Sequence, residues 1–193
     1  MGGMAVSHVA LLRGINLAGR NRVAMADLRA LVGELGHADV STYIQSGNVL
    51  FAAVPVDADP AAIGSAMSAA IADKLGVTSP VVVVSRDELT QIVADNPYPD
   101  EPDPRRVHAV VLSERPWPEL AAKLDAALAA AAAKGQRDEV RAIGRTLYLH
   151  TPDGYGNSDL AVALMRIVSA PKAGLTGTAR NWATMTKLLG MCG

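Results

Sequence analysis

The proline-rich segment Asn96–Pro104 constrains the fold of this chain more than any other feature of its sequence. Four prolines are spread along it between acidic and other polar residues. Proline fixes φ and lacks a backbone N–H, so the segment fits neither a helix nor a central strand. We therefore predict a linker at residues 96–104, between an N-terminal subdomain, residues 1–95, and a C-terminal subdomain, residues 105–193.

The residues before this linker predict strands and helices in the order β-α-β-β-α-β. Apolar residues recur at helical spacing in the longer segments, and β-branched residues are frequent in the short ones. This order is typical of a ferredoxin-like subdomain, which has a four-stranded antiparallel sheet and two helices on one face. The predicted strands are 6–13, 40–45, 48–53 and 80–85, the helices are 25–35 and 59–75, and a short helix follows at 88–94.

The residues after the linker predict nearly the same order, β-α-β-β-α-α. The predicted strands are 106–112, 139–143 and 146–150, and the predicted helices are 118–134, 158–169 and 179–189. The expected fold class is therefore α+β, with two ferredoxin-like subdomains (β-α-β-β-α-β and β-α-β-β-α-α) that contain antiparallel sheets.

Charge and cysteine content exclude several classes of function. The formal net charge is −1, so the chain as a whole is not a polycation built to coat nucleic acid or anionic lipid. Its single cysteine, Cys192, excludes an internal disulfide. The four histidines lack the spacing of metal ligands, and we expect neither a metal site nor a cofactor. The first eight residues lack the basic region of a secretory signal and no apolar run is long enough for a membrane span, so we expect a cytoplasmic protein that makes no membrane contact.

Charge is unevenly distributed along the chain. Residues 50–104 carry two basic and nine acidic groups, whereas residues 105–193 carry twelve basic and seven acidic groups. In the linker, the acidic residues Asp100, Glu101 and Asp103 are predicted to serve solubility. One interpretation of this distribution is a set of solvated surfaces. The other is a basic patch on the C-terminal subdomain that, with the first loop, favours an anionic ligand.

Five segments of the chain resemble the bacterial domain-of-unknown-function family 1697. They are Leu11–Leu17 (LLRGINL), Thr42–Asn48 (TYIQSGN), Asn96–Tyr98 (NPY), Tyr155–Ser158 (YGNS) and Ala179–Lys187 (ARNWATMTK). The resemblance implies an α+β fold of two ferredoxin-like subdomains, and it implies no activity, substrate or cofactor. After Ser158 the family usually has lysine where this chain has Asp159, which weakens an anion-binding role for that helix start.

The first candidate site is the loop that follows the first strand. Residues Gly14–Asn21 come close to a phosphate-binding P-loop, but Arg20 takes the place of the lysine and Asn21 the place of the hydroxyl that holds Mg²⁺. Two interpretations remain, a plain turn from strand to helix and a loop that binds an anion. The anion would contact Arg13, Asn16, Arg20 and Arg22.

The second candidate site is the turn of the first predicted hairpin. Four polar side chains gather there, on Tyr43, Gln45, Ser46 and Asn48, and Ile44 is expected to point into the core. Ordinary hairpin chemistry explains these residues equally well. The functional alternative is that they present phenol and amide groups on an open sheet face.

The third candidate site is the start of the last predicted helix. With Thr178 as N-cap, Arg180 and Asn181 would lie in the first turn, where free backbone N–H groups attract anions. Ser158 precedes another predicted helix, either as its cap or as a ligand contact.

Three hypotheses for the function follow. In the first, the protein is a binding module for an anionic partner, either a phosphorylated small molecule or a nucleic acid. In the second, it is a small enzyme with a polar site between its subdomains, formed by Tyr43, Ser46, Asn48 and Ser158, although these motifs contain no evident catalytic base. In the third, the motifs are structural and set the contact between the subdomains, and the function resides in a surface that binds a partner.

Overall fold

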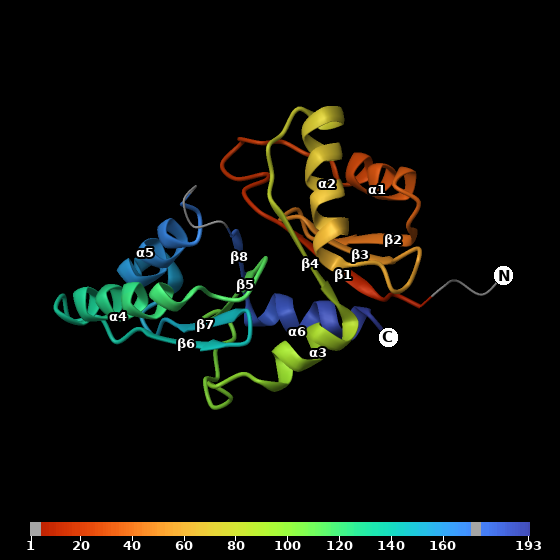
Figure 1. Cartoon of the computed structure of the whole chain (residues 1–193). Helices are drawn as coiled ribbons and strands as arrows, with labels where there is room; N and C mark the ends of the chain where they lie inside the picture. The colour runs from red at the N-terminus through yellow and green to blue at the C-terminus, as the bar shows by residue number, and fades with distance from the viewer. Residues whose placement is uncertain (1–4, 171–174) are drawn as a thin grey trace. The chain divides into compact units, whose positions relative to one another are not determined.

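The computed structural model describes residues 5–170 and 175–193, and Figure 1 shows its helices and strands. The beginning of the N-terminal segment that we examined as a leader lies outside the described residues. The chain divides into two compact units, Met1–Gln91 with Lys187–Gly193, and Ile92–Thr186. Both dividing points lie inside helices. The subdomain boundaries expected from the sequence stay a prediction.

The first unit contains an antiparallel sheet with the strand order β2-β3-β1-β4. Two helices, α1 and α2, pack against one face of it (Figure 1) and share a core that includes Phe51 and Met67. The elements are β1 (His8–Leu12), α1 (Met25–Glu34), β2 (Ala38–Tyr43), β3 (Asn48–Ala52), α2 (Pro60–Leu75), β4 (Val81–Ser85) and α3 (Arg86–Ala94).

Helix α2 shows how local sequence signals define the elements of this unit. The Asp59 side chain accepts a hydrogen bond from the backbone N–H of Ala61, Pro60 occupies the first turn, and Gly76 ends the helix in the left-handed region. Gly64 lets the helix approach β4 closely, because a Cβ atom there would lie 2.8 Å from the carbonyl oxygen of Val81.

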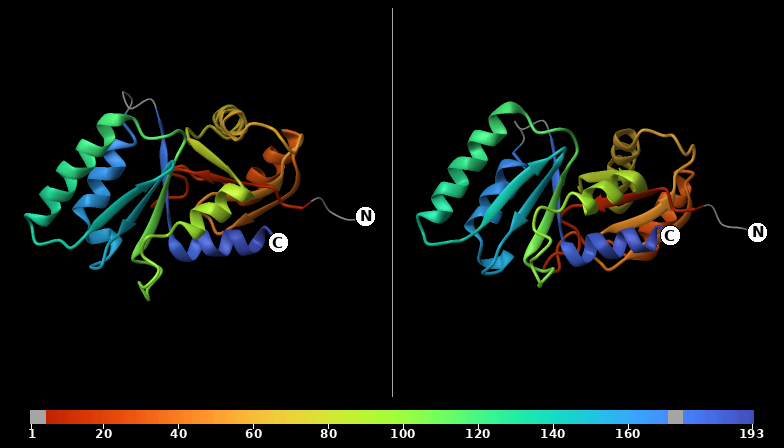
Figure 2. Two further views of the ribbon diagram at one scale, coloured as in Figure 1. Left: turned by 60° about the horizontal axis from the view of Figure 1, so that its bottom comes forward. Right: turned by 90° about the horizontal axis from the view of Figure 1, so that it is seen from below.

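The second unit repeats this arrangement with the strand order β6-β7-β5-β8, again antiparallel throughout. Helices α4 and α5 contact each other, and Figure 2 shows both on one face of the sheet. The elements are β5 (Val107–Leu112), α4 (Pro118–Ala132), β6 (Glu139–Ile143), β7 (Thr146–His150), a 3₁₀ turn (Tyr155–Asn157), α5 (Asp159–Ile167), β8 (Gly177–Asn181) and α6 (Trp182–Met191).

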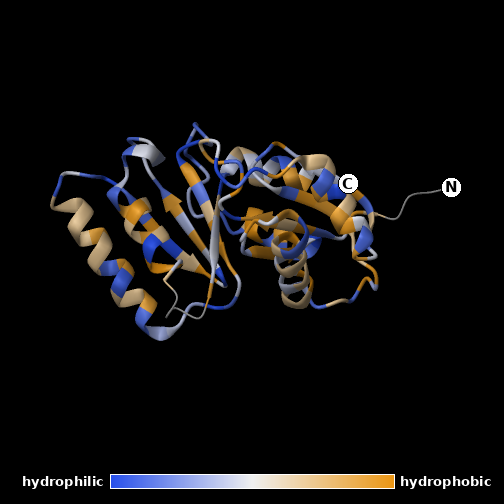
Figure 3. Ribbon diagram, turned by 90° about the horizontal axis from the view of Figure 1, so that it is seen from above, coloured by the Kyte–Doolittle hydropathy of each residue, from blue (hydrophilic) through white to orange (hydrophobic). Residues whose placement is uncertain are grey.

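The expected α+β class with antiparallel sheets is confirmed, and each of the two sheets has four strands. The strand orders are consistent with two ferredoxin-like halves. Along the helices in Figure 3, hydrophobic orange segments alternate with blue polar ones, as expected where one helix face packs on a sheet. Among the described residues, no helix is long and apolar enough to cross a membrane.

The predicted order β-α-β-β-α-α for the second half was wrong, because the residues before α6 form a strand. β8 pairs with β5, and Ala109 lies opposite Arg180. A Cβ atom on Gly177 would lie 2.9 Å from side-chain atoms of both Leu112 and Val168, so this strand also packs tightly against the core. Five residues are too few to show strand alternation, and the apolar spacing of α6 extends back to Ala179.

The proline-rich segment forms neither helix nor strand, as predicted, but it is bonded to the rest of the second unit. The backbone N–H of Trp182 donates to the carbonyl oxygen of Pro104 (3.1 Å). Just before the segment, the carbonyl oxygen of Ile92 in α3 accepts a hydrogen bond from the Tyr148 hydroxyl (2.9 Å). Within the segment, the backbone N–H of Tyr98 donates to the Asn96 side chain (3.0 Å).

Candidate functional site

The loop that follows β1, residues 13–23 and called the basic loop below, is held in one shape by Asn16. The amide oxygen of Asn16 accepts a hydrogen bond from the backbone N–H of Val23 (2.9 Å). Its amide nitrogen donates to the carbonyl oxygens of Val23 (3.0 Å) and Gln45 (2.9 Å). These bonds close the loop on itself and tie it to the turn between β2 and β3.

The backbone of the basic loop is strained but well bonded. Ala18 and Asn21 have φ angles of 46° and 50°, a region that most residues with a side chain avoid. The backbone N–H of Arg20 donates to the carbonyl oxygen of Leu17 (2.8 Å), and the side chain of Asn21 donates to the carbonyl oxygen of Gly14 (2.8 Å). Strain of this kind persists only where the surroundings hold it.

Two arginines of the basic loop extend into solvent. Arg20 and Arg22 are exposed, and neither forms an ion pair or side-chain hydrogen bond with any residue that the structure describes. No acidic residue precedes Asp27 in the sequence. Arg13 is half-buried and its backbone N–H donates to the carbonyl oxygen of Pro80 (3.0 Å). Burial lowers the pKa of its guanidinium.

The turn between β2 and β3 is organised by Asn48, which is fully buried. Its amide nitrogen donates to the carbonyl oxygen of Tyr43 and to the hydroxyl of Ser46, both at 3.0 Å. Gly47 has a φ of 78°, and a Cβ atom there would lie 2.6 Å from Cβ of Leu12. Close packing therefore requires glycine at this position.

The expectation that Ile44 points into the core was wrong. It is 51% exposed and has a φ of 51°, because β2 ends at Tyr43 and strand alternation stops there. Tyr43 is half-buried and Gln45 is exposed. The hydrogen bond from Asn16 to Gln45 brings the first and second candidate sites together in the first unit.

Ser158 and Asn181 both cap helices. The Ser158 hydroxyl donates to the Asp138 carboxylate (2.6 Å) and accepts a hydrogen bond from the backbone N–H of Ala161 (2.8 Å), so it caps α5. Asn181 ends β8, and its side chain accepts a hydrogen bond from the backbone N–H of Thr184 (2.8 Å) in α6. The prediction that Asn181 lies in the first helical turn was wrong.

Arg180 lies in β8 rather than in a helix. Thr178 lies in the same strand, so the prediction that it caps the last helix was also wrong. Arg180 is 8% exposed, and its guanidinium donates to the hydroxyl of Thr178 and the carbonyl oxygen of Ala179, both at 2.9 Å. Burial lowers its pKa to about 10. Arg180, Asn181 and Ser158 belong to the second unit, whereas the basic loop belongs to the first.

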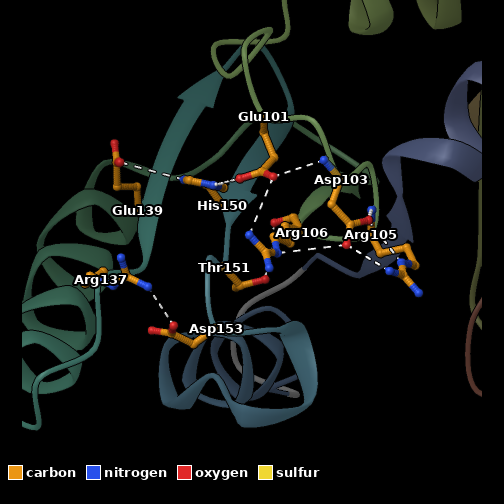
Figure 4. A network of polar contacts seen from close by, with 9 residues as sticks. All are labelled: Glu101, Asp103, Arg105, Arg106, Arg137, Glu139, His150, Thr151 and Asp153. Atoms are coloured by element: carbon orange, nitrogen blue, oxygen red, sulfur yellow. Dashed lines mark hydrogen bonds and ion pairs between the residues drawn. The ribbon is translucent and has the colours of Figure 1, made fainter.

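The second unit contains a polar network that the sequence interpretation missed (Figure 4). Nε2 of His150 lies 2.7 Å from the carboxylate of Glu101, and its Nδ1 lies 3.8 Å from that of Glu139. The ring of Tyr98 packs at 5.1 Å from the imidazole. Burial is the main cause that raises the Tyr98 pKa to about 12. Glu101 therefore fastens the proline-rich segment to the sheet.

Ion pairs continue this network. Arg105 donates to both carboxylate oxygens of Asp103, each at 3.0 Å, and these bonds lower the Asp103 pKa to about 2. Arg137 contacts Asp153 at 2.7 Å. The solubility role predicted for the acidic residues of this segment does not describe Glu101, whose side chain is 9% exposed. In the sequence, the signal that could have indicated this structural role is that Glu101 and Asp103 closely follow the Asn96–Tyr98 motif.

A hollow of about 470 Å³ lies beside this network. Asp103, Arg105 and Arg106 form one wall, and residues 152–155 form the other. Within the described part of the chain, no group of three or more histidine, cysteine, aspartate or glutamate residues is placed to hold a metal ion.

Comparison with known proteins identifies the family of the chain and a solved structure with a similar fold. Residues 5–148 match the model of the family described as "Protein of unknown function (DUF1697)". A solved structure, "The structure of conserved bacterial protein SP0830 from Streptococcus pneumoniae", is similar with a TM-score of 0.65 at 20% sequence identity. The similarity covers 98% of this chain and 100% of that one, and at this identity it shows the fold alone. No curated protein matches the chain.

Proposed function

The chain belongs to the DUF1697 family of proteins of unknown function, and on that premise we propose that it binds a small phosphorylated ligand at the basic loop. One observation carries the proposal. Arg20 and Arg22 are exposed on a loop that the protein holds rigid, and no described residue neutralises them.

Rigid placement of cations favours binding in two ways. Guanidinium groups form charge-assisted, often bidentate hydrogen bonds with phosphate oxygens. A loop that is already ordered loses little conformational entropy when the ligand arrives. Ala18 and Gly19 are exposed residues whose backbone N–H groups donate to no described residue, so they add further donors beside the arginines.

The proposal gives the candidate residues different roles. Arg20 and Arg22 contact the anion, whereas Asn16 and Asn48 position the loop and the adjoining turn through their internal hydrogen bonds. Gln45, beside Asn16, lies close enough to the loop to contact the rest of the ligand.

Two exposed arginines suit one or two phosphate groups rather than a long polyanion. A protein that tracks a nucleic-acid backbone uses an extended basic surface, which the net charge of −1 does not favour. A single-stranded oligonucleotide is therefore the alternative ligand that the experiment must test.

Isothermal titration calorimetry with pyrophosphate, ATP and a short single-stranded RNA tests the proposal. Pyrophosphate or ATP should bind the wild-type protein, and Arg20→Ala/Arg22→Ala should weaken that binding at least about tenfold, because two charge-assisted contacts are lost.

Arg115→Ala is the matched control. Arg115 is an exposed arginine of the second unit that pairs with no described residue, so its removal changes net charge without touching the loop. If Arg115→Ala weakens ligand binding as much as the double variant does, the effect is due to net charge alone and the proposal is overturned. RNA binding that greatly exceeds ATP binding would replace the small ligand by a nucleic acid.

A further inference from the structure

The hollow in the second unit has walls that are fixed by hydrogen bonds. The backbone N–H and the hydroxyl of Thr151 both donate to the carbonyl oxygen of Arg106, at 2.8 and 3.2 Å. Gly154 donates its backbone N–H to Thr151 (3.0 Å), and Asn157 donates its side-chain N–H to the carbonyl oxygen of Asp153 (3.1 Å). The groups that line the hollow are therefore held in place before any ligand arrives.

One ion pair of the wall is complete in itself. Asp103 accepts two hydrogen bonds from the guanidinium of Arg105 and one from its backbone N–H, all at 3.0 Å. Neither residue gains much by binding a further charged group, because each already contacts its counter-ion in bidentate geometry.

Arg106 is held differently, as Figure 4 shows. The nearest oxygens of Glu101 and Asp103 lie 3.9 Å from its guanidinium nitrogens, beyond hydrogen-bond distance. Its side chain is 47% exposed, and none of the guanidinium N–H groups forms a hydrogen bond with a described residue. The two carboxylates therefore balance the charge of the guanidinium but leave its N–H groups without hydrogen-bond acceptors among the described residues.

Asp153 provides an acceptor on the opposite wall. One of its oxygens accepts from Arg137 at 2.7 Å, and the other has no partner among the residues described. The hydrogen bond from Arg137 is the main cause that lowers the Asp153 pKa, and the charge of Arg106 adds a smaller lowering across the hollow. They form no ion pair, which leaves the space between them for a third group.

From this arrangement we propose that the hollow binds a zwitterionic small molecule of the amino-acid class. The carboxylate of the ligand accepts hydrogen bonds from Arg106, and its ammonium group donates to Asp153. A zwitterion matches a lining in which the Arg106 guanidinium has N–H donors without acceptors and Asp153 has one oxygen without a donor among the described residues. A ligand with a single charge would use only one of these two groups.

Tyr155 gives the hollow an aromatic surface. Its ring stacks on the imidazole of His108, with centroids 4.1 Å apart and an interplanar angle of 28°. Stacking fixes the ring, so an apolar side chain of the ligand would meet a rigid surface.

Calorimetric titration of the full chain tests the proposal, with the common L-amino acids added singly. Each amino acid that binds is then compared with its N-acetyl derivative, which retains only the anion, and with its amide, which retains only the cation. We expect both derivatives to bind at least about tenfold more weakly than the parent.

Two variants assign the charges. Arg106→Gln should weaken binding of the amino acid at least about tenfold, and Asp153→Asn should remove its advantage over the N-acetyl derivative. Arg137→Gln is the control, because Arg137 pairs with Asp153 but does not line the hollow, and it should not weaken binding. Thermal unfolding checks that each variant is folded.

Failure of every amino acid to bind would overturn the proposal. So would binding that survives in both Arg106→Gln and Asp153→Asn. Pyrophosphate titrated into the same variants keeps the outcomes separate, since neither substitution alters the basic loop. An anion that binds at Arg106 as tightly as the amino acid does would show that the ammonium contact is absent.

Discussion

The two units share one scaffold but differ at the same two loops. In each unit, the hairpin turn is hydrogen-bonded to the end of the unit's first strand. The backbone N–H of Leu12 donates to the carbonyl oxygen of Gly47 in the first unit (2.8 Å), and that of Leu112 donates to the carbonyl oxygen of Arg145 in the second (2.9 Å). The first unit extends both loops and ties them with Asn16. Loops on a common scaffold are where function differs, so the extension marks the candidate site.

The two units also differ in the charge of the side chain that connects the hairpin turn to the end of the first strand or the loop after it. In the second unit the guanidinium of Arg145 donates to the carbonyl oxygen of Leu112 (2.8 Å) and so points inward. In the first unit the neutral side chain of Asn16 forms the corresponding bond, to the carbonyl oxygen of Gln45, and Arg20 and Arg22 remain exposed. An arginine in a loop is therefore evidence for anion binding only when the structure shows that the fold does not use it.

The largest effect is expected where the two hairpin turns differ in packing. Gly47→Ala places a Cβ atom 2.6 Å from Leu12 at a φ of 78° and should destabilise the protein by about 4 kcal/mol. Gly144→Ala is the matched change in the other hairpin, where nothing lies within 4 Å, and should cost only about 1 kcal/mol. Denaturant unfolding measures both. Equal costs would show that the first turn is not closely packed.

The next prediction concerns His108, which supports the wall of the hollow. Burial lowers its pKa from 6.5 to about 4, and its Nδ1 is buried with no hydrogen-bond partner among the residues that the structure describes. Because the unfolded chain takes up the proton first, the associated stability is complete above pH 6.5. It is lost as the pH falls towards 4, by about 3 kcal/mol in all.

His108→Phe keeps the stacked ring on Tyr155 and removes the titrating group. We expect the unfolding free energy of the variant to vary less between about pH 7 and about pH 4.5 than that of the wild type. Parallel pH profiles for the two proteins would contradict the assignment of this stability to His108.

A smaller effect is expected when the tie of the basic loop is removed. Asn16→Ala deletes three hydrogen bonds and should destabilise the protein by about 2 kcal/mol. Asn21→Ala deletes one side-chain hydrogen bond and should cost about 1 kcal/mol. Chemical denaturation measures the two changes in unfolding free energy. Calorimetry should show that Asn16→Ala also weakens pyrophosphate binding, whereas Asn21→Ala does not. If Asn16→Ala leaves that binding intact, rigidity is not part of the site.

The smallest effect has the opposite sign. Ile44→Asn replaces an exposed β-branched residue at a φ of 51° with one that tolerates this conformation, and should stabilise the protein by about 1 kcal/mol. Ile143, which precedes the turn of the other hairpin, is 38% exposed in a regular strand. Ile143→Asn should therefore give no gain in melting temperature. A gain in both variants would point to exposed hydrophobicity rather than to backbone strain.

The sequence predicted the fold wherever local signals and packing agree. Helix α2 was found from Asp59, Pro60 and Gly76, and the apolar segment Val81–Ser85 formed a strand as expected. Strand β8 was missed because it is a five-residue segment whose neighbour in sequence is an amphipathic helix. Its pairing with β5 is a long-range contact, which sequence spacing does not encode.

The candidate sites were predicted less completely, for a related reason. Sequence identifies polar residues but not their partners, so Arg20, which extends into solvent, and Arg180, which is buried, looked alike. The network around His150 joins Glu101 and Glu139 over large separations in sequence. Only the paired strands and the packed proline-rich segment bring these groups together.

The central claim is that the basic loop binds an anion through Arg20 and Arg22, and NMR titration with pyrophosphate tests it most directly. With the arginine Nε–H signals assigned, those of Arg20 and Arg22 should shift together and saturate, because phosphate oxygens accept their hydrogen bonds. The signal of the exposed Arg115 should stay in place. Unchanged signals from Arg20 and Arg22 at saturating pyrophosphate, or equal shifts from all three arginines, would contradict the account.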